Sequence, residues 1–154
     1  MDMKINVKSA EVSERSLTDK LVESRQSIVD EFGGIEHRLE LISTFGGVEY
    51  VNDSKATDVN STWYSLECMV KPVVWIVGLS DLETDYSIFN DLVLQNVKAI
   101  VCLGKNLDGT LNSLIERVDC FSEASSVSEA VQISNSLSSD GDVVLFSPAC
   151  SSFH

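Results

Sequence analysis

The sequence predicts an α/β fold built on a mostly parallel β-sheet, and two observations carry this prediction. Continuous apolar runs occur at VVWIVG (73–78), AIVCLG (99–104) and DVVLFS (142–147). Runs of this kind, without alternating polar residues, are typical of parallel strands that are buried on both faces. Segments of helical length and amphipathic pattern separate the runs, as expected for βαβ units.

The chain before the first of these strands is predicted to form a helix and a hairpin. SLTD (16–19) has the pattern of a capping box, and apolar residues then recur at helical spacing until Gly33. β-rich stretches follow at 39–45 and 48–52. The two glycines between them predict an antiparallel hairpin.

The rest of the chain alternates between helix and strand patterns. A short strand is expected at about 119–121, before the last helix. The predicted helices cover residues 58–69, 86–96, 108–117 and 126–138. With right-handed crossovers, this order gives a Rossmann-like sheet with helices on both faces, extended by the hairpin.

Composition and charge restrict the class of partner. The chain has 154 residues and a formal net charge of −13, which argues against a nucleic-acid surface or an anionic membrane surface. No apolar run approaches the roughly 20 residues of a membrane span, and the first residues lack the apolar core of a signal peptide. The cysteines are widely spaced and form no CxxC pair. We therefore expect a cytoplasmic monomer with reduced, mostly buried thiols and no metal centre.

The loops after the strands are the expected place for a ligand, because open α/β sheets bind ligands beyond the carboxyl ends of their strands. The loop after 48–52 is rich in polar side chains. Asp53 could accept hydrogen bonds from a ribose, Lys55 could bind a carboxylate or phosphate, and Thr57 lies near the start of a predicted helix. A plainer interpretation is also open: Asp53 and Lys55 form a surface ion pair, and Thr57 is the N-cap.

The terminal stretch SPACSSFH (147–154) is a second polar loop, although Ser147, Ser151 and Ser152 could simply form turns. No convincing Ser/His/Asp set is present. The phosphate-loop pattern GxxxxGK[ST] and the dinucleotide pattern GxGxxG are also absent, which disfavours an oxidoreductase of the Rossmann type.

Four stretches resemble one known domain. They are GGIEHRLE (33–40), NDSKATDVNSTW (52–63), VWIVG (74–78) and LFSPACSSF (145–153). Together they are similar to the C-terminal domain of the Mur ligases that add D-glutamate. The resemblance implies that residues 37–154 form that domain, truncated before its last helix. It also implies that residues 1–36 are the end of the preceding region.

The resemblance implies an ATP-dependent amide-bond ligase of peptidoglycan synthesis. In this family ATP phosphorylates the carboxylate of UDP-N-acetylmuramoyl-L-alanine, and the amine of D-glutamate attacks the acyl phosphate. ATP and Mg²⁺ are held mainly by a central domain that this chain lacks. The chain alone is therefore expected to be inactive, with no catalytic residue of its own.

The resemblance also implies ligand contacts, carried over motif by motif. Arg38 and Asp53 would face the adenosine part of the nucleotide. The residues implied for D-glutamate are Lys55, Thr57, Ser152 and Phe153.

Two positions depart from the family pattern. The family has Asn where this chain has Asp58, and it has a D-glutamate-binding lysine where this chain has Leu82. Lys105, in the next post-strand loop, is a candidate replacement for that lysine. The alternative to a ligase domain is a non-catalytic remnant that keeps the fold without binding the ligands.

Overall fold

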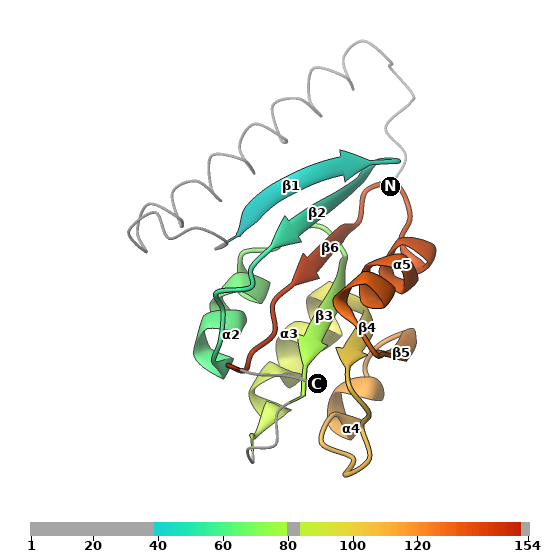
Figure 1. The fold of residues 1–154 in the computed structure, drawn as a ribbon. Helices are drawn as coiled ribbons and strands as arrows, with labels where there is room; N and C mark the ends of the chain where they lie inside the picture. Colours follow the sequence, from blue (N-terminus) through green and yellow to red (C-terminus); the bar gives the residue numbers. More distant parts are fainter. Residues whose placement is uncertain (1–38, 80–83, 152–154) are drawn as a thin grey trace. The chain divides into compact units, whose positions relative to one another are not determined.

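A computed structural model of the chain describes residues 39–79 and 84–151 (Figure 1). Their strands form one six-stranded sheet in the order β1-β2-β6-β3-β4-β5. The strands are β1 (Glu40–Phe45), β2 (Val48–Asn52), β3 (Val73–Gly78), β4 (Val97–Leu103), β5 (Cys120–Ala124) and β6 (Val143–Phe146). The predicted helix near 16–32 and the predicted boundary at 36 lie outside the described residues.

The sheet is parallel from β2 to β5, and only the edge strand β1 runs antiparallel to its neighbour. The prediction of a mostly parallel sheet extended by an N-terminal hairpin is therefore confirmed. The hairpin turns at Gly46 and Gly47, whose φ angles of 59° and 77° lie in the left-handed region. Glycine is the residue that adopts this conformation at little steric cost, and successive positive φ angles suit a tight hairpin turn.

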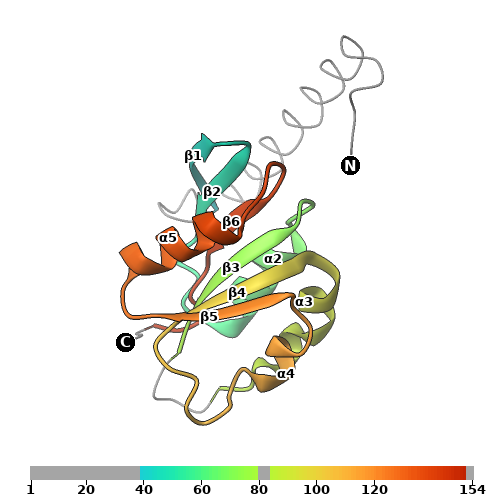
Figure 2. The same ribbon diagram turned by 90° about the vertical axis from the view of Figure 1, so that its right-hand side faces the viewer.

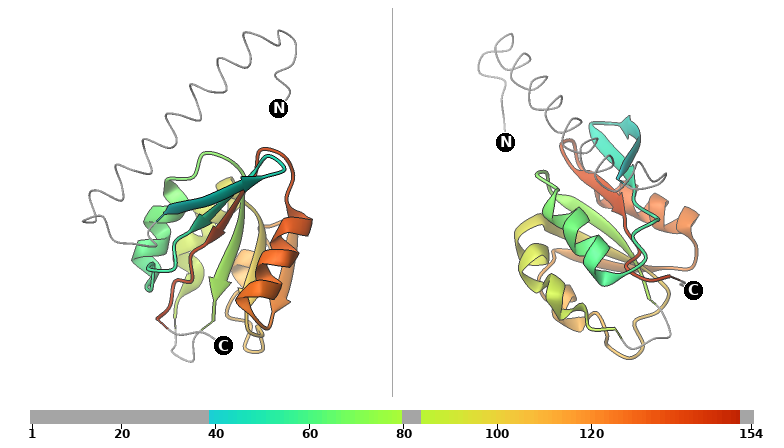
Figure 3. Two further views of the ribbon diagram at one scale, coloured as in Figure 1. Left: turned by 45° about the horizontal axis from the view of Figure 1, so that its top comes forward. Right: turned by 90° about the vertical axis from the view of Figure 1, so that its left-hand side faces the viewer.

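Helices cover both faces of the sheet (Figures 1 and 3). α5 (Val127–Leu137) packs on one face, and α2 (Val59–Glu67) and α3 (Asn90–Asn96) lie on the other. The short helices η1 (Tyr86–Phe89) and α4 (Asn112–Ile115) adjoin α3 (Figure 2). Within the described residues, no helix has the length and apolar character needed to cross a membrane.

Alternate residues of β3 serve the two layers. Ile76 belongs to a buried cluster that includes Ala130 of α5. Trp75 faces the other layer, where the centroid of its ring lies 5.0 Å from the ring centroid of Phe89. Both faces of the strand are apolar because both are covered, which explains the unbroken run VVWIVG.

Two helices differ from their predicted bounds. The segment predicted as one helix over 86–96 begins as a 3-10 turn, with the Asp85 side chain accepting a bond from Ser87 N. The helix predicted over 108–117 is reduced to α4. Gly109 has a φ of 71°, and the Asn106 side chain accepts a bond from Leu111 N, so local side-chain bonds replace the first helical turn.

Candidate functional site

The strand order brings two polar loops together at the carboxyl edge of the sheet. β2 and β6 are parallel neighbours, with Asn52 paired to Phe146, so the chain leaves both strands side by side. Asp53 N then donates to Phe146 O at 2.8 Å, and Ala149 N donates to Ala56 O at 3.0 Å. The loops that hold most of the ligand residues predicted from the sequence are therefore hydrogen-bonded to each other.

The loop after β2 exposes two of the predicted ligand residues while its backbone is fixed. Ala56 is buried, and its N–H donates to Asp53 O at 2.9 Å. Lys55 and Thr57, on either side of Ala56, are exposed. No described residue forms an ion pair with Lys55, and Asp53 is fully buried, so the expected surface pair between Asp53 and Lys55 is not formed.

The N-cap of α2 is Asp58, not Thr57. The Asp58 carboxylate accepts a hydrogen bond from Ser61 N at 2.8 Å. The interpretation of Thr57 as a simple N-cap is therefore wrong, because a carboxylate one residue later satisfies the free N–H of the first turn. The Thr57 hydroxyl stands just ahead of the helix start and is exposed.

Beneath these exposed residues lies a buried polar cluster of Asp53, Ser147 and Thr62, which we call the hydroxyl relay. All three residues are 0% exposed. Ser147 Oγ donates to Asp53 Oδ2 at 2.7 Å and lies 2.8 Å from Thr62 Oγ1. Asp53 Oδ1 accepts from Leu39 N at 3.2 Å. Asp53 thus bonds inside the protein, and Ser147 does more than form a turn.

The backbone of Ser147 is also fixed. Its N–H donates to Ile76 O at 3.1 Å, and its carbonyl accepts from the Trp75 indole at 2.9 Å. Two residues later, Ala149 has a φ of 62°, in the region that favours glycine. Strained backbone of this kind persists where surrounding contacts determine it, and here the bond from Ala149 N to Ala56 O is one of them.

A buried phenol, Tyr86, lies in η1, and a buried thiol, Cys102, lies in β4. The Tyr86 hydroxyl donates to Gly78 O at 3.0 Å. Burial, followed by the nearby Cys150 and Cys102, raises the pKa of Tyr86 to about 12. Burial and then Glu123 raise the pKa of Cys102 to about 12. Both groups therefore stay neutral at ordinary pH.

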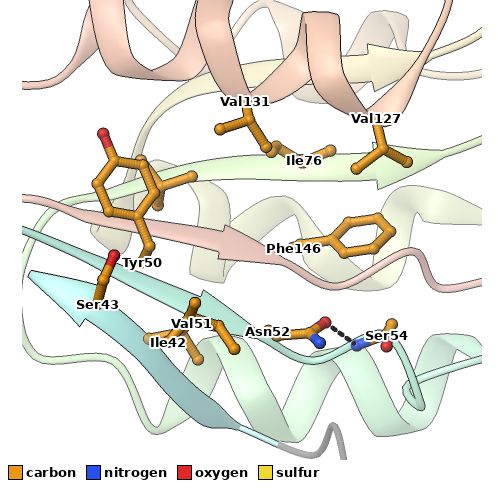
Figure 4. Close-up of a pocket in the computed structure, with 11 residues that line it drawn as sticks. Ile42, Ser43, Tyr50, Val51, Asn52, Ser54, Ile76, Val127, Val131 and Phe146 are labelled. Atoms are coloured by element: carbon orange, nitrogen blue, oxygen red, sulfur yellow. Dashed lines mark hydrogen bonds between the residues drawn. The ribbon is translucent and has the colours of Figure 1, made fainter.

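A groove of about 410 Å³ lies elsewhere, on the face of the sheet beside α5 (Figure 4). Val127 and Val131 of α5 face Ile42 and Phe146 across it. The lining is mostly apolar and does not include Lys55 or Thr57. Asn52, at the end of β2, and Ser54, in the loop after β2, also line the groove, so the groove borders that polar loop.

The remaining residues predicted from the sequence are less informative. Arg38, Leu82, Ser152 and Phe153 lie outside the described residues. Lys105 is exposed in the loop after β4. Among residues 39–79 and 84–151, no group of three His, Cys, Asp or Glu side chains is arranged to hold a metal ion. The four cysteines form no disulfide with one another, and Cys120 is exposed.

Thr62 was not among the residues predicted from the sequence, although one signal was available. Thr62 and Leu66 are four residues apart and therefore share a helix face, and both are buried. A hydroxyl on an apolar helix face needs a hydrogen-bond partner. The identity of that partner, Ser147, depends on tertiary contacts.

Known proteins resemble this chain in sequence over most of its length. Residues 37–150 match the family described as "Mur ligase, glutamate ligase domain". A UDP-N-acetylmuramoylalanine–D-glutamate ligase of Christiangramia forsetii is 43% identical over 154 residues, covering 97% of this chain and 34% of the relative. The corresponding ligase of Salinibacter ruber is 40% identical over 142 residues, covering 90% of this chain and 31% of the relative. The chain thus spans about a third of the length of these relatives.

Solved structures show the same fold at low sequence identity. A murein peptide ligase of Psychrobacter arcticus superposes with a TM-score of 0.53 at 14% identity, over 75% of this chain and 27% of that one. A domain of a putative UDP-N-acetylmuramate:L-alanyl-γ-D-glutamyl-meso-diaminopimelate ligase of Haemophilus ducreyi gives 0.51 at 11% identity, over 73% of this chain and 88% of that one. These likenesses show the fold. The family match and the sequence relatives show that the chain belongs to the family of Mur ligase glutamate ligase domains.

Proposed function

We propose that this chain is the D-glutamate-binding part of an ATP-dependent ligase that adds D-glutamate to UDP-N-acetylmuramoyl-L-alanine in peptidoglycan synthesis. The observation that carries the proposal is the pairing of the two polar loops, which presents Lys55 and Thr57 from a fixed backbone. The names of the sequence relatives support the substrate.

D-Glutamate carries two carboxylates, and the loop after β2 has groups suited to them. The Lys55 ammonium is a cationic donor, and the Thr57 hydroxyl stands ahead of the N-terminus of α2, where backbone N–H groups favour anions. Ser152 and Phe153 follow the loop after β6 in sequence. In this proposal they complete the contacts to D-glutamate.

On the nucleotide side, the proposal assigns Arg38 and Asp53. Since Asp53 is buried, it would act through the chain segment that it holds. Its Oδ1 accepts the N–H of Leu39, the residue after Arg38, at 3.2 Å. ATP supplies the phosphoryl group that activates the acceptor carboxylate, and its Mg²⁺ would be held mainly by residues of another domain.

The proposal is tested by calorimetric titration of the chain with D-glutamate, with L-glutamate as the stereochemical control. Lys55→Ala is expected to weaken D-glutamate binding roughly tenfold to a hundredfold, the value of a hydrogen bond to a charged group. Lys105→Ala tests the candidate replacement on a different post-strand loop, and we expect it to leave the affinity for D-glutamate unchanged. Equal affinity for both enantiomers, or no binding of either, would refute the proposal.

ATP turnover provides a second test. Phosphoryl transfer depends on positioned cations and phosphate-binding groups, which the proposal assigns to another domain. The purified chain is therefore expected to hydrolyse no ATP above background. Hydrolysis that persists in Lys55→Ala would show that the assigned division of labour is wrong.

A further inference from the structure

We infer that Ser147 and Thr62 are positioning residues, whose hydroxyl relay to Asp53 holds the loop bearing Lys55 and Thr57 in register with the loop after β6. This inference deepens the proposed function and rests on it for the identity of the ligand. The relay itself touches no ligand. Its three members are fully buried below the exposed side chains.

The direction of the relay follows from counting protons. A serine hydroxyl has one hydrogen to donate, and the Ser147 hydrogen is directed to Asp53 Oδ2. At the 2.8 Å contact with Thr62, Ser147 Oγ must therefore accept, and Thr62 Oγ1 must donate. The chain of bonds runs from Thr62 through Ser147 to the Asp53 carboxylate, and each step joins segments distant in sequence.

Ser147 is the point at which four elements meet. Its side chain bonds the loop after β2 through Asp53 and bonds α2 through Thr62. Its backbone bonds β3 through Ile76 O and the Trp75 indole. Ser147 itself begins the loop after β6. One buried hydroxyl thus fixes the loop after β2 to a rigid strand of the core.

The exposed residues depend on this attachment. Lys55 lies between Asp53, which accepts the bond from Ser147, and Ala56, whose carbonyl accepts the bond from Ala149. If the relay is broken, one of these two attachments to the loop after β6 is lost. Displacement of binding groups by about 1 Å is enough to reduce function substantially.

The variants are chosen to separate the relay from general stability. Ser147→Ala removes the central hydroxyl, and Thr62→Val removes the donor with little change of shape. Thr62→Ser retains a hydroxyl and should restore the behaviour of the original chain. Ser134→Ala is the matched control, because the Ser134 hydroxyl is equally buried but has no hydrogen-bond partner among the described residues.

Amide hydrogen exchange on the 154-residue chain is the first measurement. In Ser147→Ala and Thr62→Val, the amides of Ala56 and Ala149 are expected to exchange about tenfold faster or more, relative to core amides such as that of Val101. Thr62→Ser and Ser134→Ala should show no selective change. Exchange at the loops that stays unchanged, or that rises equally throughout the chain, would overturn the inference.

The second measurement is a D-glutamate titration that is monitored through the amide NMR signals of Lys55 and Thr57. Because these signals report the folded protein, a loss of stability alone does not change the measured affinity. Ser147→Ala is expected to weaken D-glutamate binding severalfold, and Thr62→Ser to leave it unchanged. Weakening by Lys55→Ala without any by Ser147→Ala would overturn the positioning role while supporting the proposed function. No response of the original chain to D-glutamate would overturn the proposed function, and exchange would still decide whether the relay holds the loops.

Discussion

The loop after β2 and the loop after β4 both leave a buried parallel strand and both present a lysine, but they are held in different ways. The loop after β2 is anchored by Asp53, a fully buried carboxylate that bonds Ser147. The loop after β4 is anchored by Glu123, an exposed carboxylate that accepts from Asn106 N at 2.8 Å. The bonds have similar lengths, so burial is the main difference between the two anchors.

Burial changes what each bond contributes. An exposed group can exchange its protein partner for water, so the net value of its hydrogen bond is small. A buried donor that loses its acceptor has no water to replace it and keeps the full desolvation penalty. Lys55 is therefore the lysine with the more firmly fixed backbone, and Lys105 is carried by a loop more tolerant of change.

The largest expected effect is that of Asp53→Ala. The substitution leaves Ser147 Oγ and Leu39 N without their buried acceptor. Each of the two orphaned groups costs about 1–3 kcal/mol, so the free energy of unfolding should fall by about 2–6 kcal/mol. Denaturant unfolding measures this loss of free energy.

Glu123→Ala is the paired variant on the exposed anchor and should change the free energy of unfolding by about 0.5 kcal/mol or less. Similar losses for both variants would show that burial does not distinguish the two loops.

The two loops also differ in how far local sequence patterns predict them. The sheet from which they emerge was predictable because VVWIVG and AIVCLG are apolar throughout, a local pattern that needs no knowledge of neighbours. The site residues were predictable in part, since Lys55 and Thr57 follow a strand whose carboxyl end must meet the other loops. The bounds of α4 were not, because Asn106 competes with the helix through its side chain.

The hydroxyl relay could not be predicted from local sequence patterns. Ser147 and Asp53 are 94 residues apart in sequence, and Ser147 and Thr62 are 85 apart. No periodicity or motif in one segment specifies a partner at such a distance. The pairing forms only because the strand order places β6 next to both β2 and β3.

A further effect is expected from alkaline pH, and it concerns two buried groups, Tyr86 in η1 and Cys102 in β4. The pKa of Tyr86 is raised from 10.0 to about 12, and that of Cys102 from 9.0 to about 12, both chiefly by burial. The unfolded chain therefore loses these protons at a lower pH than the folded chain does. Stability should be fully present below about pH 9 and should decline as the pH rises from about 9 to about 12.

Urea midpoints at about pH 8 and about pH 11 measure this decline. Cys102→Ala and Tyr86→Phe each remove one titrating group, so each should reduce the difference between the two midpoints. The two variants separate the contribution of Tyr86 and Cys102 from that of the rest of the protein. A pH difference that is unchanged in both variants would show that these groups do not control it.

The smallest expected effect is that of Asp58→Asn, at the exposed start of α2. Asp58 caps the helix through Ser61 N, and Asn is an equally good N-cap. The free energy of unfolding should therefore change by only a few tenths of a kcal/mol, mostly from the lost interaction with the helix dipole. Asp58→Ala is the contrasting variant, because it removes the cap and should cost about 1 kcal/mol. Thermal unfolding of the two variants separates the effect of capping from the effect of charge.

In the proposed function, Asp58→Asn also removes an anion beside Thr57. D-Glutamate should therefore bind this variant slightly more tightly, and more so at low salt. Weaker binding by Asp58→Asn with unchanged stability would instead mean that the carboxylate itself takes part in holding the ligand.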